Sequence, residues 1–194
     1  MRKWPTWSQK QRTFERLGYR PHAGQERLHQ ENDARLLVVM GAERSGKSEA
    51  TAKEIVARLP WCTESAGGAG NVALCAEDYD KARREMEYIA QDMETLGALL
   101  DKSTPKSGKW IIETVFGTIE TISLKDGPHD LTGTGDPFDI VGLVEWGLIS
   151  QDALNAAMGR TGETRGLVIA SGTLQDTYGW QPDLYEALAA QPNI

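Results

Sequence analysis

A phosphate-binding signature is the feature of this sequence that points most directly to chemistry. Residues 41–48 fit the pattern G-x-x-x-x-G-K-S/T of a P-loop. Gly41 and Gly46 permit the backbone turns that aim successive N–H groups at phosphate oxygens. Lys47 supplies a positive charge for the β and γ phosphates, and the Ser48 hydroxyl is a Mg²⁺ ligand. The residues predicted to bind ATP are Gly41, Ala42, Glu43, Arg44, Ser45, Gly46, Lys47 and Ser48.

A second motif is expected of a P-loop hydrolase: a buried strand that ends in an acid for Mg²⁺ and in a glutamate that orients the attacking water. Residues 139–145 have this shape, but Val144 stands where the metal-side acid is expected. Adjacent strand residues face opposite ways, so Glu145 cannot serve both functions. Two assignments remain open. Either Glu145 is the general base and the metal-side acid is lost, or Glu145 is the metal-side acid and another residue, such as Asp152, is the base.

Buried strands alternate with helical segments along the chain. Continuous apolar runs predict buried strands at 36–40, 72–76, 139–144 and 167–170. Residues 110–115 and 119–124 read as a hairpin or as two short strands. Helices are expected at 23–33, 46–59 (closed by Pro60), 152–158 and 182–190, and after Asp78, where an apolar stripe runs through 82, 86, 89, 93 and 96. Residues 101–108 read as a polar loop. This order predicts an α/β P-loop NTPase fold (ASCE-like) with a mainly parallel central sheet and helices on both faces. Residues 1–34 form an N-terminal segment, and 35–194 form the core.

Composition limits the possible partners. The chain has 194 residues and a net charge of −7, which excludes a uniformly basic nucleic-acid coat and requires any DNA contact to be local. Lys102, Lys106 and Lys109 form one basic cluster, either such a contact or a solvated face. Cys62 and Cys75 are expected to be packing residues, the three histidines are too scattered for a zinc site, and no apolar run is long enough to cross a membrane.

In the order of these motifs, from about residue 17 to 180, the sequence resembles the ATPase domain of tailed-phage terminase large subunits. Residues 19–25 are similar to an upstream segment whose glutamine, here Gln25, contacts adenine. The loop containing Arg44, the strand and turn at 72–79, Leu131-Thr132-Gly133 and the acidic strand follow in the family's order. The resemblance puts Glu145 on the catalytic glutamate and therefore favours the first assignment above. It also puts Ser171, Gly172 and Thr173 on the motif that couples nucleotide state to DNA movement.

The resemblance implies Mg²⁺-dependent ATP hydrolysis that powers packaging of double-stranded viral DNA into a procapsid. Glu145, Lys47 and Arg44 would be catalytic and Ser48 would hold the metal. The implied partners are double-stranded DNA, further copies in a homo-oligomeric ring, the portal and the small terminase subunit, in the cytoplasm of an infected bacterium. The chain stops soon after the coupling motif, so we expect no nuclease domain and no DNA cleavage.

A further departure concerns the arginine that acts on a neighbour's γ-phosphate. Thr132 and Thr134 stand in a loop where the family often has arginine. Arg160 and Arg165 are alternative sources of a trans-acting arginine, or they are solvated loop charges.

Two other functions remain open on sequence grounds. One is another P-loop enzyme, such as a helicase-like ATPase or a nucleotide kinase. The other is a nucleotide-binding assembly or regulatory module with weak hydrolysis, which Val144 motivates.

Overall fold

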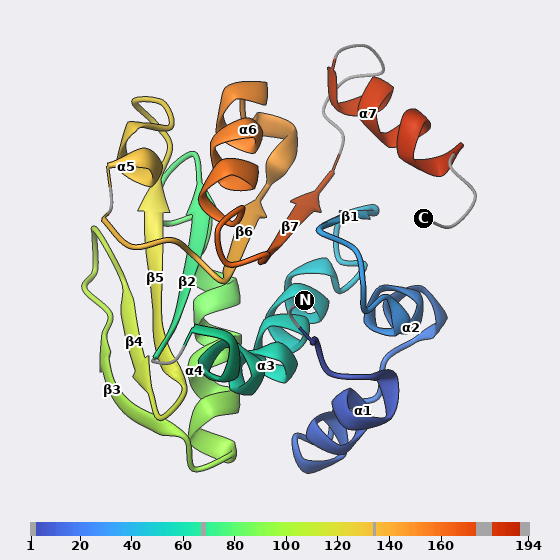
Figure 1. Cartoon of the computed structure of the whole chain (residues 1–194), viewed down its shortest axis with the longest axis vertical. Helices are drawn as coiled ribbons and strands as arrows, with labels where there is room; N and C mark the ends of the chain where they lie inside the picture. The colour runs from blue at the N-terminus through green and yellow to red at the C-terminus, as the bar shows by residue number, and fades with distance from the viewer. Residues whose placement is uncertain (1–2, 67–68, 134, 174–179, 191–194) are drawn as a thin grey trace.

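A single mixed sheet organises the chain. The computed structural model describes residues 3–66, 69–133, 135–173 and 180–190. Within them, seven strands form one sheet in the order β1-β7-β6-β2-β5-β4-β3 (Figure 1). The strands are β1 (Leu36–Met40), β2 (Gly70–Ala76), β3 (Leu99–Ser103), β4 (Ile111–Thr114), β5 (Gly117–Ser123), β6 (Ile140–Val144) and β7 (Leu167–Gly172).

Five of the strands are parallel. The pairs β1–β7, β7–β6, β6–β2 and β2–β5 run in the same direction, while β5–β4 and β4–β3 are antiparallel. The predicted α/β fold with a mainly parallel sheet is therefore confirmed, as is the hairpin. The prediction of a loop was wrong for residues 101–103, which form the edge strand β3. Residues 101–103 are polar and exposed, so the strand lacks the apolar run that identifies a buried strand.

Helices cover both faces of the sheet. One face packs against α3 (Lys47–Ala66) and α4 (Arg83–Thr95), and the other against α5 (His129–Thr132) and α6 (Gln151–Arg160). Strand β6 shows the division: Ile140 and Val144 lie in the α3/α4 layer, while Val141 and Leu143 lie in the opposite layer. The short helix η1 (Trp146–Leu148) follows β6, and α7 (Trp180–Ala189) follows β7. No described helix is long and apolar enough to cross a membrane.

The structure confirms the sequence prediction for α4 and corrects the one for α3. The apolar stripe of α4 is core, as predicted: Met86, Ile89 and Met93 are fully buried. The prediction that Pro60 ends α3 was wrong, because the helix continues to Ala66. Proline cannot donate the helical hydrogen bond of its turn. The segment beyond it is nevertheless anchored, since Cys62 is fully buried and its Cβ lies 2.6 Å from where a Cβ on Gly70 would be. Both cysteines are free and buried, as predicted.

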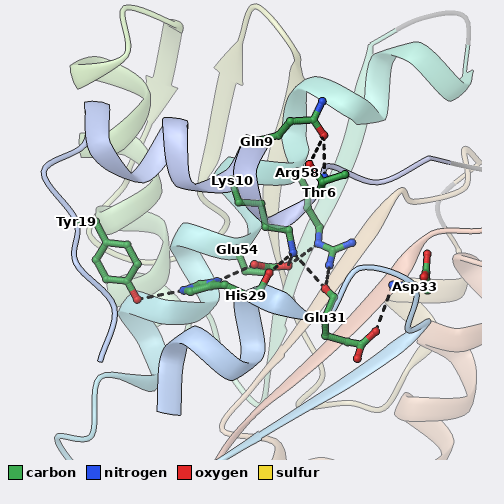
Figure 2. Close-up of polar contacts among 9 residues, drawn as sticks. All are labelled: Thr6, Gln9, Lys10, Tyr19, His29, Glu31, Asp33, Glu54 and Arg58. Atoms are coloured by element: carbon green, nitrogen blue, oxygen red, sulfur yellow. Dashed lines mark hydrogen bonds and ion pairs between the residues drawn. The ribbon is translucent and has the colours of Figure 1, made fainter. Parts of the chain in front are cut away.

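The N-terminal helices α1 (Trp7–Arg16) and α2 (Ala23–Gln30) attach to α3 through a buried carboxylate (Figure 2). Glu54 accepts from Lys10 Nζ at 2.7 Å, from His29 Nδ1 at 2.7 Å and from Arg58 Nε at 2.6 Å. All four side chains are fully buried. Because the carboxylate can only accept, His29 donates to it through Nδ1, and the other ring nitrogen, Nε2, lies 3.1 Å from the Tyr19 hydroxyl.

Burial and pairing act against each other in this cluster. Burial alone would raise the pKa of Glu54, but the hydrogen bond from His29 and the charges of Arg58 and Lys10 lower it to about 2. Burial lowers the pKa of Lys10 to about 8, although Glu54 opposes this change. Backbone carbonyls complete the shell: Lys10 donates to His29 O and Glu31 O, and Arg58 donates to Glu31 O. The loop that follows α2 is thereby held against α3.

We expect Glu54→Gln to lower the free energy of unfolding at neutral pH by about 3–5 kcal/mol, because buried Lys10 and Arg58 lose their countercharge. Chemical denaturation monitored by circular dichroism measures this loss. Glu87→Gln, at an exposed position of α4, is the control and should change stability by no more than about 0.5 kcal/mol.

The same pair of variants predicts a pH dependence. The pKa of Glu54 falls from its ordinary value of 4.5 to about 2 on folding. Its stabilising contribution is thus complete above pH 4.5 and is lost as the pH falls towards 2. Between these pH values the wild type should lose more stability than Glu54→Gln does. Equal losses in both proteins would contradict the assigned role of this carboxylate.

Candidate nucleotide-binding site

The predicted P-loop joins β1 to α3 at the carboxyl edge of the parallel strands. Gly46 has φ +79°, a conformation that glycine adopts without strain, and Arg44 has φ +60°, which is costly for a residue with a side chain. Lys47 Nζ lies inside the loop and donates to the carbonyls of Gly41 and Ala42, each at 2.8 Å. A Cβ on Gly41 would lie 2.7 Å from Ser45 Oγ, so the loop closes tightly only with glycine there.

The start of α2 holds the P-loop from outside. Gln25 Nε2 donates to Gly46 O at 3.1 Å, and His22 Nε2 lies 3.2 Å from Ser45 O. The same two side chains cap α2, because Gln25 Oε1 accepts from the His22 amide and His22 Nδ1 accepts from the Gly24 amide. The structure thus brings Gln25 to the P-loop, whereas contact with adenine stays a prediction. His22 was not predicted as a site residue, although it stands within the upstream segment.

The predicted coupling motif contacts both halves of the site. Strand β7 lies between β1, which leads into the P-loop, and β6, which leads into Glu145. Thr173 Oγ1 donates to Gly41 O at 3.1 Å. A Cβ on Gly172 would lie 2.8 Å from the Trp146 amide nitrogen and 3.2 Å from Glu145 C, so the strand end and this turn approach closely only with glycine. Ser171 is buried and pairs with Val144 in the sheet.

Glu145 leaves the end of β6 in a strained conformation. Its backbone is left-handed (φ 51°, ψ 48°), which turns the chain out of the sheet and into η1. Its charge raises the pKa of Glu85, although burial of Glu85 makes the larger contribution. Val144, in contrast, is buried among apolar side chains of the α3/α4 layer. Residue 144 therefore makes an apolar contact in the core, where the motif would have a carboxylate.

Glu85 is a site residue that the sequence reasoning missed. It lies in the first turn of α4 and is only 2% exposed. Burial raises the pKa of Glu85, and the Ser48 side chain opposes this rise. The signal was available: residue 85 is three after Ala82 and four before Ile89, so an acid occupies a position on the buried helix stripe.

Other predicted residues lie away from the P-loop. Arg160, at the end of α6, donates to Asp136 O and lies over the Phe138 ring. Arg165 is exposed in the turn before β7, at the amino edge of the parallel strands. Neither can reach the P-loop at the opposite edge of its own chain, so a role toward a neighbouring copy stays a prediction. Asp152 is exposed in the first turn of α6.

Two further features predicted from the sequence are the loop with Thr132 and Thr134 and the cluster of three lysines. Thr132 is exposed at the end of α5, and Thr134 lies outside the described residues. Lys109 pairs with Glu120 at 2.5 Å, which leaves Lys102 and Lys106 as exposed cations of the predicted cluster.

This arrangement suits a Mg²⁺–nucleotide complex. The P-loop and Lys47 present donors for phosphate oxygens, and Ser48 lies in the first turn of α3, whose N-terminus favours an anion. The Ser48 hydroxyl and Glu85 carboxylate are oxygen ligands of the kind that Mg²⁺ prefers. Glu145 lies near enough to influence Glu85 electrostatically, so acid, metal-ligand and phosphate-binding groups meet at one edge of the sheet.

Comparisons with known proteins establish the fold. No protein-family model and no curated protein matches the chain, but solved structures do. An ATPase-domain variant of the large terminase of Thermus phage P74-26 aligns with 89% of this chain and 72% of its own length, at 23% identity and a TM-score of 0.65. The large terminase of bacteriophage HK97 aligns with 88% of this chain and 37% of its own length, at 15% identity and a TM-score of 0.65.

A third similar structure was solved with a nucleotide analogue. It is the large terminase of a thermophilic bacteriophage in complex with ATP-γ-S, and it aligns with 87% of this chain and 38% of its own length, at 12% identity and a TM-score of 0.53. The chain therefore has the fold of large-terminase ATPase domains, and it spans less than two-fifths of these two longer terminases.

We expect Gly172→Ala to lower the free energy of unfolding by about 1–3 kcal/mol, because the added methyl group collides with the Trp146 backbone. Gly159→Ala is a matched control within α6, where a Cβ meets nothing within 4 Å. That control should stabilise the protein by about 0.5–1 kcal/mol through its helix propensity. Denaturant titrations of both variants test whether the effects have opposite signs.

Proposed function

We propose that this chain is the ATPase domain of a phage large terminase and hydrolyses ATP to drive packaging of double-stranded DNA into a procapsid. One observation carries the proposal: consecutive residues at the end of β7 contact the P-loop and the Glu145 turn, at the predicted coupling motif. The fold of terminase ATPase domains and the order of the motifs support it.

The proposed reaction is the attack of water on the γ-phosphate. A bond forms between the water oxygen and the γ-phosphorus, the bond to the β–γ bridging oxygen breaks, and ADP and inorganic phosphate result. Glu145 accepts the proton of the water. Lys47 and the loop amides stabilise charge on the phosphoryl oxygens, and Arg44, exposed in the same loop, adds a further cation.

A residue in the first turn of α3 would hold the metal. Ser48 is the motif ligand, and bound Mg²⁺ supplies neutralisation of negative charge on the β and γ phosphates. Gln25 would position the nucleotide base, because it lies against Gly46 at the mouth of the loop.

The wider assembly follows from the same proposal. Further copies would form a ring around double-stranded DNA, and Arg160 or Arg165 would face a neighbour's γ-phosphate. The portal and the small terminase subunit would be the other partners, in the cytoplasm of the infected host. With a net charge of −7, this chain would contact DNA only locally and in a salt-sensitive way.

A second candidate function rests on Val144. If the apolar residue at this position weakens metal binding, the chain would be a nucleotide-binding assembly or regulatory module with weak hydrolysis. Phosphate release measured against protein concentration, with and without duplex DNA, separates the two functions. A steep rise with concentration favours the motor, and flat, negligible release favours the module.

We expect Lys47→Ala to weaken ATP binding by about 10- to 100-fold, because it removes a charged hydrogen-bond donor to phosphate. Isothermal titration calorimetry measures the affinity. Lys125→Ala, an exposed turn residue, should bind as the wild type does. Unchanged affinity in Lys47→Ala would rule out the phosphate-binding role of the loop.

We expect Glu145→Gln to retain ATP binding and to slow hydrolysis by about 10²- to 10⁴-fold, the usual contribution of a general base. Asp152→Asn is the matched control, because Asp152 is the alternative base and lies exposed on α6. Both rates come from single-turnover phosphate release. Slow hydrolysis in Asp152→Asn, with a normal rate in Glu145→Gln, would reverse the assignment.

A further inference from the structure

The ring of His22, the N-cap of α2, lies between two backbone groups whose hydrogen-bonding roles are fixed. Its Nδ1 lies 3.1 Å from the Gly24 amide, which can only donate, and its Nε2 lies 3.2 Å from Ser45 O, which can only accept. Nδ1 therefore carries no proton, and Nε2 carries one. A single neutral tautomer makes both hydrogen bonds, and the two partners select it.

Protonation of the ring disrupts this arrangement. In the imidazolium form both ring nitrogens are donors, so Nδ1 can no longer accept from the Gly24 amide. The two N–H groups would then face each other across the 3.1 Å that separates the nitrogens. The charged ring must move off the cap, which also withdraws Nε2 from Ser45 O. Because His22 is exposed, protons of the solvent reach it directly.

The start of α2 holds two consecutive peptides of the P-loop. His22 binds Ser45 O, and Gln25 donates to Gly46 O at 3.1 Å. A Cβ on Gly46 would lie 2.6 Å from Gln25 Nε2 and 4.0 Å from His22 Nε2, so both side chains lie against this residue. In a planar trans peptide the carbonyl and the N–H point in opposite directions. Fixing these two carbonyls therefore aims the N–H groups of Gly46 and Lys47 away from α2.

We propose that neutral His22 is a positioning residue for phosphate binding: by holding Ser45 O, it keeps the Gly46 N–H turned toward the phosphates. The inference rests on the proposed function, because it requires a bound nucleotide. A P-loop binds phosphate through successive backbone N–H groups, so a peptide that is free to rotate gives a weaker donor. His22 acts through the backbone of the loop and not on the nucleotide itself.

This role gives nucleotide affinity a pH dependence of defined sign. The charged residues in the segment before the cap, the P-loop and the first turn of each helix are Arg20, Glu26, Glu43, Arg44, Lys47 and Glu49. Histidine is the side chain that ordinarily gains a proton between pH 7.5 and 5.5, whereas carboxylates, lysine and arginine keep their charge. Acid therefore weakens binding through His22. A ring that acted only as a cation beside the phosphates would strengthen binding in acid.

Two variants separate the contacts of the ring. The terminal atoms of asparagine lie where Nδ1 lies, and those of glutamine lie near the position of Nε2. His22→Asn therefore keeps a cap acceptor without reaching Ser45 O, whereas His22→Gln reaches Ser45 O and gives up the cap. With ADP and Mg²⁺ at pH 7.5, we expect His22→Asn to bind about 3- to 10-fold more weakly than the wild type and His22→Gln to bind within about twofold of it. Isothermal titration calorimetry on the intact protein measures these affinities.

The pH profile is the second measurement. From pH 7.5 to 5.5 the wild type should lose about 3- to 10-fold in ADP affinity relative to His22→Gln, and at pH 5.5 it should bind as weakly as His22→Asn. The comparison cancels titration of the nucleotide and of Lys10 and His29, which all the proteins share. His129→Gln, at an exposed position of α5, is the matched control and should keep the wild-type profile.

Several outcomes would overturn the inference. Tight binding by His22→Asn with weak binding by His22→Gln would assign the ring to the cap alone. Parallel pH profiles of the wild type and His22→Gln, or tighter binding by the wild type in acid, would also contradict it, while the proposed function would stand. If the wild type binds ADP at neither pH, the proposed function fails and the inference fails with it. If His22→Gln does not fold, the wild type and His22→Asn decide the test, since their affinities must differ at pH 7.5 and converge at pH 5.5.

Discussion

One buried carboxylate constrains the geometry of the whole nucleotide site. Glu54 binds cationic or hydrogen-bonding groups from α1, α2 and α3, and it fixes α2 against the helix that begins at the P-loop (Figure 2). The other end of α2 then holds the loop through Gln25 and His22. Such a cluster adds little net free energy of unfolding, because the cost of burying the ions nearly equals the gain from their attraction. Its effect is positional: α2 meets the loop at one defined angle.

Strain and close packing are concentrated where the loop and the sheet meet. Arg44 and Glu145 both have left-handed backbones, a conformation that costs about 1–3 kcal/mol for residues with side chains. Gly172 permits the contact that holds the Glu145 turn, and Thr173 holds the P-loop. The rigid sheet behind these contacts supports the strained residues. Groups that would bind phosphate and activate water are therefore positioned by the same strand.

Apolar periodicity accounts for what the sequence predicted well. Strands β1 and β6 are continuous apolar runs, and the α4 stripe has helical spacing. Apart from Pro60 within α3, the failures share a cause, which is polar residues in structured positions. On helix α1, the buried face that carries Trp7 and Phe14 also carries Lys10, whose countercharge Glu54 lies far along the chain. Helical spacing does place Glu85 on the buried stripe of α4, but it does not show which groups lie around it. Local patterns cannot show a partner that only the fold brings near.

The placement of β7 also sets the order in which a newly made chain can assemble this site. Within the part of the chain that the structure describes, β1 lies at the edge of the sheet beside β7. Thr173 is 132 residues from its partner Gly41. Contacts of such long sequence separation are slow to form. During synthesis the P-loop leaves the ribosome well before the strand that anchors it. Until then β1 is an unpaired apolar strand, and this interval is when the chain is most exposed to misassembly.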